Sequence, residues 1–209
     1  MRRSVVVFDL GGVITVPPWV PIDAYGVEAG LPEGAMSSYF RDDPVFAQLE
    51  RGETTLREFM KSVGVRVQEA YGIRIDLRAL GAAGIVGGEM NPDMIAFVSA
   101  LHRAGIRLGL LTNNTKEAPD WRSRIPIECF EAVIDSSEVG MRKPDPAIYQ
   151  LMLDALGADA AEVVFVDDTA INLPPAAAMG IATVHFVDPA EGRAAIAELC
   201  GLDLATLTN

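Results

Sequence analysis

Positive charge is scarce in this sequence, which has 17 lysines and arginines against 29 aspartates and glutamates. The formal net charge is -12 at pH 7. A chain this acidic is repelled by the phosphates of nucleic acids and by anionic lipid headgroups. We therefore expect neither a nucleic acid nor an anionic membrane as a partner.

Cysteines and long hydrophobic runs are also scarce. Cys129 and Cys200 show neither metal-ligand spacing nor a disulfide framework, so we expect both in the core of a protein from the reducing cytoplasm. No uncharged apolar run reaches the roughly 18 residues that a membrane span needs. The apolar run 5–8 follows two arginines but ends at Asp9, and we interpret it as a strand rather than a signal peptide. The sequence thus predicts a soluble chain.

Histidine is rare as well, with two residues in the chain. We expect His102 on the polar side of a helix and His185 within or just after the last strand. Neither position indicates catalysis by histidine, although histidine is the side chain that titrates nearest neutral pH.

Apolar residues, by contrast, make up half of the 209 residues, enough for one packed domain or a domain with a modest insertion. Short β-rich runs alternate with helical stretches. This pattern predicts an α/β fold, with a Rossmann-like parallel sheet and flanking helices. The five expected strands are 5–8, 106–111, 132–134, 163–166 and 182–187.

Two helices are expected to pack on this sheet. The Asn-Pro-Asp segment 91–93 is typical of a helix start, with proline in the first turn, and Gly105 would end that helix. The Asp-Pro pair 145–146 begins a second helix that Gly157 would end.

Residues 16–86 break the alternation, because they contain no convincing strand and are typical of helices joined by turns. Thr55 and Glu58 fit a capping box, in which each side chain binds an amide of the first helical turn, and helix follows to about Tyr71. We predict an inserted helical subdomain at 16–86, within an α/β core of residues 1–15 and 87–209.

Prolines and glycines mark both edges of this insertion. Pro17, Pro18 and Pro21 lie at one edge, and the glycine-rich run 81–88 lies at the other. Such edges are typical of hinges.

Four short polar segments are expected near the carboxyl ends of the strands, the edge where open α/β sheets bind ligands. They contain Asp9 before two glycines, Thr112 and Asn113 after a later strand, Lys143 just before a helix, and the pair Asp167 and Asp168. Taken alone, the first three have common alternatives: a turn aspartate, a polar turn and a solvated loop lysine. The adjacent carboxylates are harder to explain, because they repel each other unless a cation or donors compensate them. Mg²⁺ suits that role, since it takes oxygen ligands.

The order and spacing of these segments resemble those of the haloacid dehalogenase-like hydrolase superfamily. The resemblance covers nearly the whole chain and is most specific in segments 139–149 and 165–173. These read VGMRKPDPAIY and FVDDTAINL, and they are similar to the phosphatase domain found N-terminal in soluble epoxide hydrolases. The segment 8–13, FDLGGV, also resembles the first domain of some multidomain acyl-CoA dehydrogenase proteins.

The resemblance implies a two-step phosphoryl transfer on a small phosphorylated metabolite. In this reaction Asp9 attacks phosphorus, and water then hydrolyses the aspartyl phosphate. Thr112 and the Asn113 amide would bind the phosphoryl oxygens. Lys143 would offset charge on the nucleophile and on the transferring group.

The resemblance also implies a bound Mg²⁺ and a mobile cap. The Asp9 carboxylate, the Gly11 backbone carbonyl and Asp168 would hold the metal, with Asp167 in the outer shell. The helical insertion would correspond to the cap, which closes over the site and selects the substrate.

Gly11 departs from the family pattern, because most phosphatases of the family have there a second aspartate that protonates the leaving oxygen and later activates water. Such assistance is worth about 10² to 10⁴ in rate. Asn172 also stands where many relatives have a further acid. Either the leaving group needs little protonation, as in an acyl or anomeric phosphate, or another group supplies the proton, or turnover is poor.

Other functions fit parts of the pattern. Phosphonoacetaldehyde hydrolases also lack that aspartate and use a cap lysine, which here could only be Lys61; a surface helix position explains this lysine better. Dehalogenation is disfavoured because it dispenses with the metal that Asp167 and Asp168 suggest. A non-hydrolytic domain that binds a phosphorylated ligand is supported by Gly11. The sequence leaves the oligomeric state open.

Overall fold

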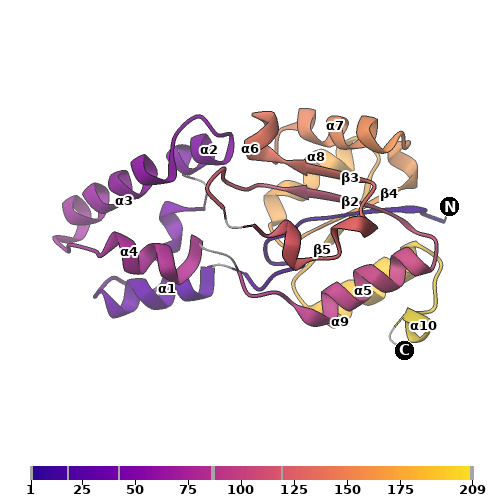
Figure 1. The fold of residues 1–209 in the computed structure, drawn as a ribbon, viewed down its shortest axis with the longest axis horizontal. Helices are drawn as coiled ribbons and strands as arrows, with labels where there is room; N and C mark the ends of the chain where they lie inside the picture. Colours follow the sequence, from indigo (N-terminus) through magenta and orange to yellow (C-terminus); the bar gives the residue numbers. More distant parts are fainter. Residues whose placement is uncertain (1, 18, 42, 86–87, 119, 208–209) are drawn as a thin grey trace.

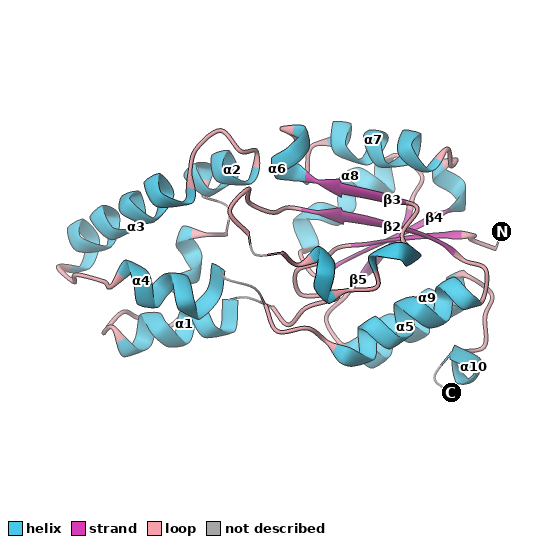
Figure 2. Cartoon of the chain, in the orientation of Figure 1, coloured by secondary structure: helices cyan, strands magenta, loops and turns pink. Residues whose placement is uncertain are grey.

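The computed structural model describes residues 2–17, 19–41, 43–85, 88–118 and 120–207. Figure 1 shows two lobes, a helical lobe drawn from residues 19–85 and an α/β lobe drawn from the rest of the chain. Within the described residues, the strands all belong to the α/β lobe (Figure 2).

The α/β lobe is built on a five-stranded parallel sheet with the order β3-β2-β1-β4-β5. Its strands are β1 (Val5–Phe8), β2 (Arg107–Thr112), β3 (Ala132–Asp135), β4 (Val163–Asp167) and β5 (Ala182–His185). The sheet confirms the predicted fold class. It also places β1 at the centre, between β2 and β4.

Several strand boundaries differ from the prediction: β2, β3 and β4 each end one residue later than expected, and β2 and β5 show two further differences. β2 begins one residue late because the Ile106 N–H donates to the Leu101 carbonyl at 3.1 Å, which closes the preceding helix. β5 was expected to reach residue 187 but ends at His185, which pairs with the last residue of β4. A strand at the sheet edge ends where its single neighbour ends.

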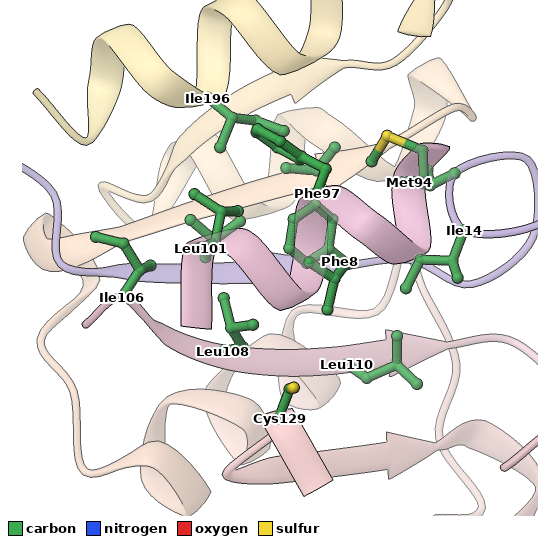
Figure 3. Close-up of a cluster of buried hydrophobic side chains, with 14 of the residues drawn as sticks. Phe8, Ile14, Met94, Phe97, Leu101, Ile106, Leu108, Leu110, Cys129 and Ile196 are labelled. Atoms are coloured by element: carbon green, nitrogen blue, oxygen red, sulfur yellow. The ribbon is translucent and has the colours of Figure 1, made fainter. Parts of the chain in front are cut away.

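The two faces of the sheet bury different residues of each strand, since successive strand side chains point to opposite faces. Val6 and Phe8 belong to one hydrophobic cluster, and Val5 and Val7 belong to the other. Figure 3 shows the first cluster, which also contains Cys129. Helices α5 (Pro92–Arg103), α9 (Pro189–Leu199) and α10 (Leu204–Leu207) cover this face, and α7 (Pro146–Leu156) and α8 (Leu173–Ala178) cover the other. Both cysteines are buried, as expected.

The expected helix ends are confirmed by their caps. The Asn91 side chain accepts the N–H groups of the first turn of α5, and Gly105, with φ of 80°, follows that helix. Asp145 caps α7, and Gly157 ends it in the left-handed region. No described helix is both long and apolar enough to cross a membrane.

The helical lobe has a hydrophobic cluster of its own. The lobe comprises α1 (Trp19–Glu28), α2 (Pro44–Glu50), α3 (Leu56–Tyr71), α4 (Leu77–Leu80) and a π-helical turn at Gly81–Ile85. The capping box of Thr55 and Glu58 is present at the start of α3. Three phenylalanine rings in the cluster, those of Phe40, Phe46 and Phe59, lie between 5.2 and 5.4 Å apart.

The expected edges of the insertion are described only in part. Pro18, Val86 and Gly87 lie outside the described residues. The start of the glycine-rich run, Gly81–Ile85, is a π-helical turn that directly follows α4. The two connections to the α/β lobe run side by side, with an antiparallel bridge between Thr15 and Met90.

Candidate active site

The carboxyl ends of the three central strands bring the predicted reactive residues together. Asp9 follows β1, Thr112 ends β2, and Asp167 ends β4. Phe8 pairs with Leu110 on one side and with Val166 on the other, so these strand ends are adjacent. The topology therefore gathers residues that are separated by up to about 160 positions in the sequence.

Lys143 is completely buried, which excludes the solvated loop lysine considered from the sequence. Its Nζ lies 2.9 Å from Asp9 Oδ1 and 2.6 Å from Asp167 Oδ2. Burial alone would lower the pKa of Lys143, but the charges of Asp167 and Asp9 outweigh burial and raise that pKa above its ordinary value. Lys143 therefore stays an ammonium ion beside Asp9.

Asn113 fixes the backbone of this lysine. Its Nδ2 donates to the Lys143 carbonyl at 3.0 Å, and its Oδ1 accepts the Lys143 N–H at 2.9 Å. The side chain of Asn113 thus positions the lysine loop, and the phosphate contact expected from the sequence would fall to its backbone amide.

Asp167 is a fully buried acceptor whose oxygens are occupied by protein donors. Its Oδ2 accepts from Lys143, its Oδ1 accepts the Thr169 N–H at 2.8 Å, and the Asn172 Nδ2 donates to both oxygens. Asn172 therefore orients Asp167. With its oxygens occupied, Asp167 is suited to the outer-shell role predicted for it.

Three carboxylates form a cluster that could hold a cation. One oxygen each of Asp9, Asp167 and Asp168 lie within 4.8 Å of one another. Burial raises the pKa of Asp9 above its usual range, although Lys143 lowers it, and the charges of Asp167 and Asp168 add to the rise. Burial and Asp167 also raise the pKa of Asp168. This excess of buried negative charge, on hard oxygen donors, fits a divalent ion such as Mg²⁺.

The two glycines after Asp9 have different constraints. Gly12 has φ of 71°, and a Cβ there would lie 2.1 Å from Asp168 Oδ2. At Gly11 a Cβ would meet nothing within 4 Å, and φ is not in the left-handed region. Position 11, where the resemblance implies an aspartate, is therefore open space that a side chain could enter.

A cavity of about 930 Å³ lies over these strand ends, between the sheet and the helical lobe. Its floor includes Asp9, Gly11, Thr112, Asn113, Lys143 and Asp168. Large apolar side chains from both lobes line much of the remaining wall, among them Trp19, Phe40, Phe46, Trp121 and Phe186. The Thr112 side chain is buried, and its hydroxyl makes one long contact, 3.4 Å to the Asn113 carbonyl.

Sequence reasoning gave no functional role to several polar residues that line this cavity, among them Glu50, Arg142 and His185. Glu50 lies at the end of a helix in the insertion, where no motif marks it. Arg142 directly precedes Lys143 and carries no motif of its own. Lys61 and His102, by contrast, are exposed and do not line the described part of the cavity.

The fold and this site define the class of protein. Residues 4–180 match the haloacid dehalogenase-like hydrolase family, and the chain belongs to that family. It is 31% identical over 221 residues to bifunctional epoxide hydrolase 2 of Sus scrofa, an alignment that covers 98% of this chain and 40% of the relative. The chain thus spans about two fifths of that relative's length, and the similarity is to the N-terminal phosphatase domain, as predicted.

Two further proteins illustrate the family. The chain is 27% identical to a sesquiterpene phosphatase of Aspergillus oryzae, over 87% of this chain and 89% of that relative. A family enzyme of Bacteroides thetaiotaomicron, solved with magnesium and inorganic phosphate, has a TM-score of 0.63 at 24% identity and covers 87% of this chain and 93% of that chain. At this identity the solved structure supports the fold alone.

Proposed function

We propose that this protein is a Mg²⁺-dependent phosphatase that acts on small organic phosphate monoesters through an aspartyl phosphate on Asp9. One observation carries the proposal. The Asp9 carboxylate lies at the end of the central strand, 2.9 Å from a buried ammonium group, on the floor of a cavity. A nucleophile, a fixed cation and spare carboxylate ligands in one place are what phosphoryl transfer requires.

The first step breaks the phosphate ester. An oxygen of Asp9 attacks phosphorus, the bond from phosphorus to the ester oxygen breaks, and that leaving oxygen takes a proton. Lys143, held between Asp9 and Asp167, offsets the negative charge on the attacking and phosphoryl oxygens. The Thr112 hydroxyl and the Asn113 backbone amide bind the phosphoryl oxygens.

The second step restores the enzyme. Water attacks the phosphorus of the aspartyl phosphate, inorganic phosphate leaves, and the Asp9 carboxylate is regenerated. Asp9, Asp168 and the Gly11 carbonyl would hold Mg²⁺, with Asp167 behind them, and the bound cation would stabilise charge on the phosphoryl oxygens.

The cavity indicates the kind of ester. Its aromatic and aliphatic wall favours a substrate whose organic part is apolar, since burying that part releases apolar surface from water. The similarity to a protein named a sesquiterpene phosphatase supports the same substrate class. We propose that residues 16–86 act as the cap that supplies much of this wall.

The two alternatives have less support. A lysine-dependent cleavage of phosphonates would need Lys61 at the site, but Lys61 is exposed on α3 and does not line the described cavity. A phosphate-binding domain without turnover is supported by Gly11 alone, and it gives no role to the pairing of Asp9 with Lys143.

The test is hydrolysis of 4-nitrophenyl phosphate by the purified chain, with Mg²⁺ and with excess EDTA. We expect release of nitrophenol with Mg²⁺ and its loss with EDTA. A library of phosphorylated metabolites and prenyl phosphates, scored for free phosphate, would then identify the substrate. Absence of release at every Mg²⁺ concentration, together with measurable phosphate binding, would contradict the proposal and favour the binding domain.

A further inference from the structure

We propose that Glu50, supplied by the helical lobe, donates the proton to the leaving oxygen that the aspartate missing at position 11 would have donated. This inference rests on the proposed phosphatase function and names the residue that completes it. Glu50 is the last residue of α2 and lines the cavity that also contains Asp9.

Two independent contacts hold Glu50 over the loops of the site. Its Oε2 lies 2.6 Å from Arg142 Nε, and Arg142 directly precedes Lys143. Its backbone carbonyl accepts the Ser136 hydroxyl at 2.6 Å, and the Ser136 oxygen accepts the Asn114 N–H at 2.9 Å. Asn114 directly follows Asn113. Glu50 is therefore anchored to the lysine loop and to the loop that would bind phosphate.

The other titratable side chains of the cavity have different roles, which also leaves Glu50 as the proton donor. The carboxylic side chains that line the described part of the cavity are those of Asp9, Asp168 and Glu50. Asp9 would be the nucleophile, and Asp168 would hold the metal. His185 also lines the cavity, but its Nε2 lies 3.0 Å from the Asp168 backbone carbonyl, so a proton on that nitrogen is donated there.

Glu50 also has the protonation behaviour that a general acid needs. Burial raises its pKa to about 7, against the lowering by Arg142, Lys143 and Arg51, the charged groups that act on it. Near neutral pH a large part of the molecules therefore carry the proton. Arg142 is the charged partner of the buried Oε2 atom, at 2.6 Å, and it lowers the pKa of Glu50 without outweighing burial.

The proton balance closes over the two steps. When the bond from phosphorus to the leaving oxygen breaks, the Glu50 carboxyl gives its proton to that oxygen and becomes a carboxylate. When water attacks the aspartyl phosphate, the carboxylate takes a proton from that water. Glu50 ends the cycle protonated, and no other reactant is required.

The test measures log kcat/KM against leaving-group pKa for Glu50→Gln, from 4-nitrophenyl phosphate to alkyl phosphates. Glutamine keeps the size of the side chain but cannot donate the proton. We expect a loss of about 10² to 10⁴ on alkyl phosphates and a small change on the nitrophenyl ester, whose leaving group needs no proton. Glu53→Gln, in the exposed pair with Arg51, is the matched control and should match the parent.

A second variant guards against misfolding. Gly11→Asp, introduced into Glu50→Gln, should restore alkyl phosphate turnover, because position 11 is open to a side chain. Such a gain cannot come from damage to the fold. An equal loss on every substrate would overturn the proposal and leave Glu50 as a residue that holds Arg142 in place, and unchanged alkyl activity would overturn it too. A parent protein without Mg²⁺-dependent turnover on the nitrophenyl ester would instead contradict the phosphatase function itself, and the inference with it.

Discussion

Lys143 carries two roles in the arrangement of the site. Its ammonium group is completely buried and makes ion pairs with Asp9 and Asp167. Removing one partner of a buried ion pair commonly destabilises a protein by about 3–5 kcal/mol, because it leaves a charge without compensation. The contacts that would organise the chemistry therefore also fasten the loop before α7 to the ends of β1 and β4.

Asp9→Asn should abolish turnover while the protein stays folded. Asparagine has nearly the same size but lacks the attacking carboxylate, and Asp167 still compensates Lys143. We expect a fall in kcat of about 10³-fold or more, in the range seen for removed nucleophiles. Phosphate release and thermal unfolding measure the two effects, with Asp154→Asn on the exposed side of α7 as the control. Substantial Mg²⁺-dependent activity in Asp9→Asn would remove Asp9 from its role.

Substitutions of Asp167 and Asp168 should have different effects on the Mg²⁺ requirement and on thermal stability. Asp168→Asn should raise the Mg²⁺ concentration for half-maximal activity beyond the roughly 10- to 100-fold typical of outer partners. Asp167→Asn should instead lower the melting temperature more, because Asp167 is the buried partner of Lys143 and Asn172. A Mg²⁺ titration and a thermal melt of each variant are compared. Equal effects in both measurements would show that the inner and outer assignments are wrong.

The two glycines make a matched pair of variants. Gly12→Ala should destabilise the fold by at least about 1–2 kcal/mol, because it puts an L side chain into the left-handed region. It should also displace Asp168 and raise the Mg²⁺ requirement. Gly11→Ala should fold like the parent, since its Cβ meets open space. Urea unfolding measures the free energy of unfolding of both variants. Equal losses of stability in the two variants would mean that the loop has another conformation.

At the scale of the element, the helices depend on local caps that need no help from the rest of the fold. In α3, the Glu58 N–H donates to the Thr55 hydroxyl at 3.2 Å, and the Thr55 N–H donates to the Glu58 carboxylate at 3.1 Å. These bonds occupy amides that a helix start otherwise leaves unpaired. The helical lobe therefore has a stability term that is independent of the active site.

Thr55→Ala should lower the free energy of unfolding by about 0.5–2 kcal/mol, the usual cost of losing such a cap. Activity on 4-nitrophenyl phosphate at saturation should change little, because Thr55 does not line the described cavity. Thr54→Ala is the control, since it leaves both backbone bonds of the cap intact. Urea unfolding measures the difference, and identical midpoints for the two variants would contradict a stabilising cap.

At the scale of the whole molecule, the two lobes are joined by contacts on one side of the cavity. Besides Glu50 with Arg142, Lys116 Nζ donates to the Gly52 carbonyl at 3.1 Å, and the Glu117 carboxylate accepts the Leu56 N–H at 3.2 Å. These groups come from α2, α3 and the turn between them on one lobe, and from the loop after β2 and the loop before α7 on the other. A change in the charge of Glu50 therefore acts at the contact between the lobes.

This contact predicts a pH dependence of stability. The folded pKa of Glu50 is raised from 4.5 to about 7, so the folded state binds a proton more tightly than the unfolded chain. Its contribution to stability is complete below about pH 4.5 and is lost as the pH rises through about 7. In EDTA, the urea midpoint of the parent should fall more steeply between pH 5 and 8 than that of Glu50→Gln. Parallel curves would contradict the raised pKa.

How much of the site could be predicted depended on the range of the interactions involved. Asp9, Thr112 and the pair Asp167 and Asp168 follow apolar strands, so parallel pairing alone brings them to one edge. Glu50 had no such signal. It meets Arg142 only because the helical lobe packs over that edge, and helix periodicity says nothing about what a lobe faces.

The sequence by itself determined the α/β class, the five strands, the capped helices and the order of the polar segments, because each depends on side chains within a few positions of one another. The tertiary structure decided that Lys143 is buried and charged, that Asn172 and Asn113 serve as supports, and that Gly11 faces open space. It also placed Glu50, from the helical lobe, in the wall of the cavity that contains Asp9. Burial, which shifts the pKa values of Asp9, Lys143 and Glu50, is set by residues that lie far apart in the chain and meet only in the folded molecule.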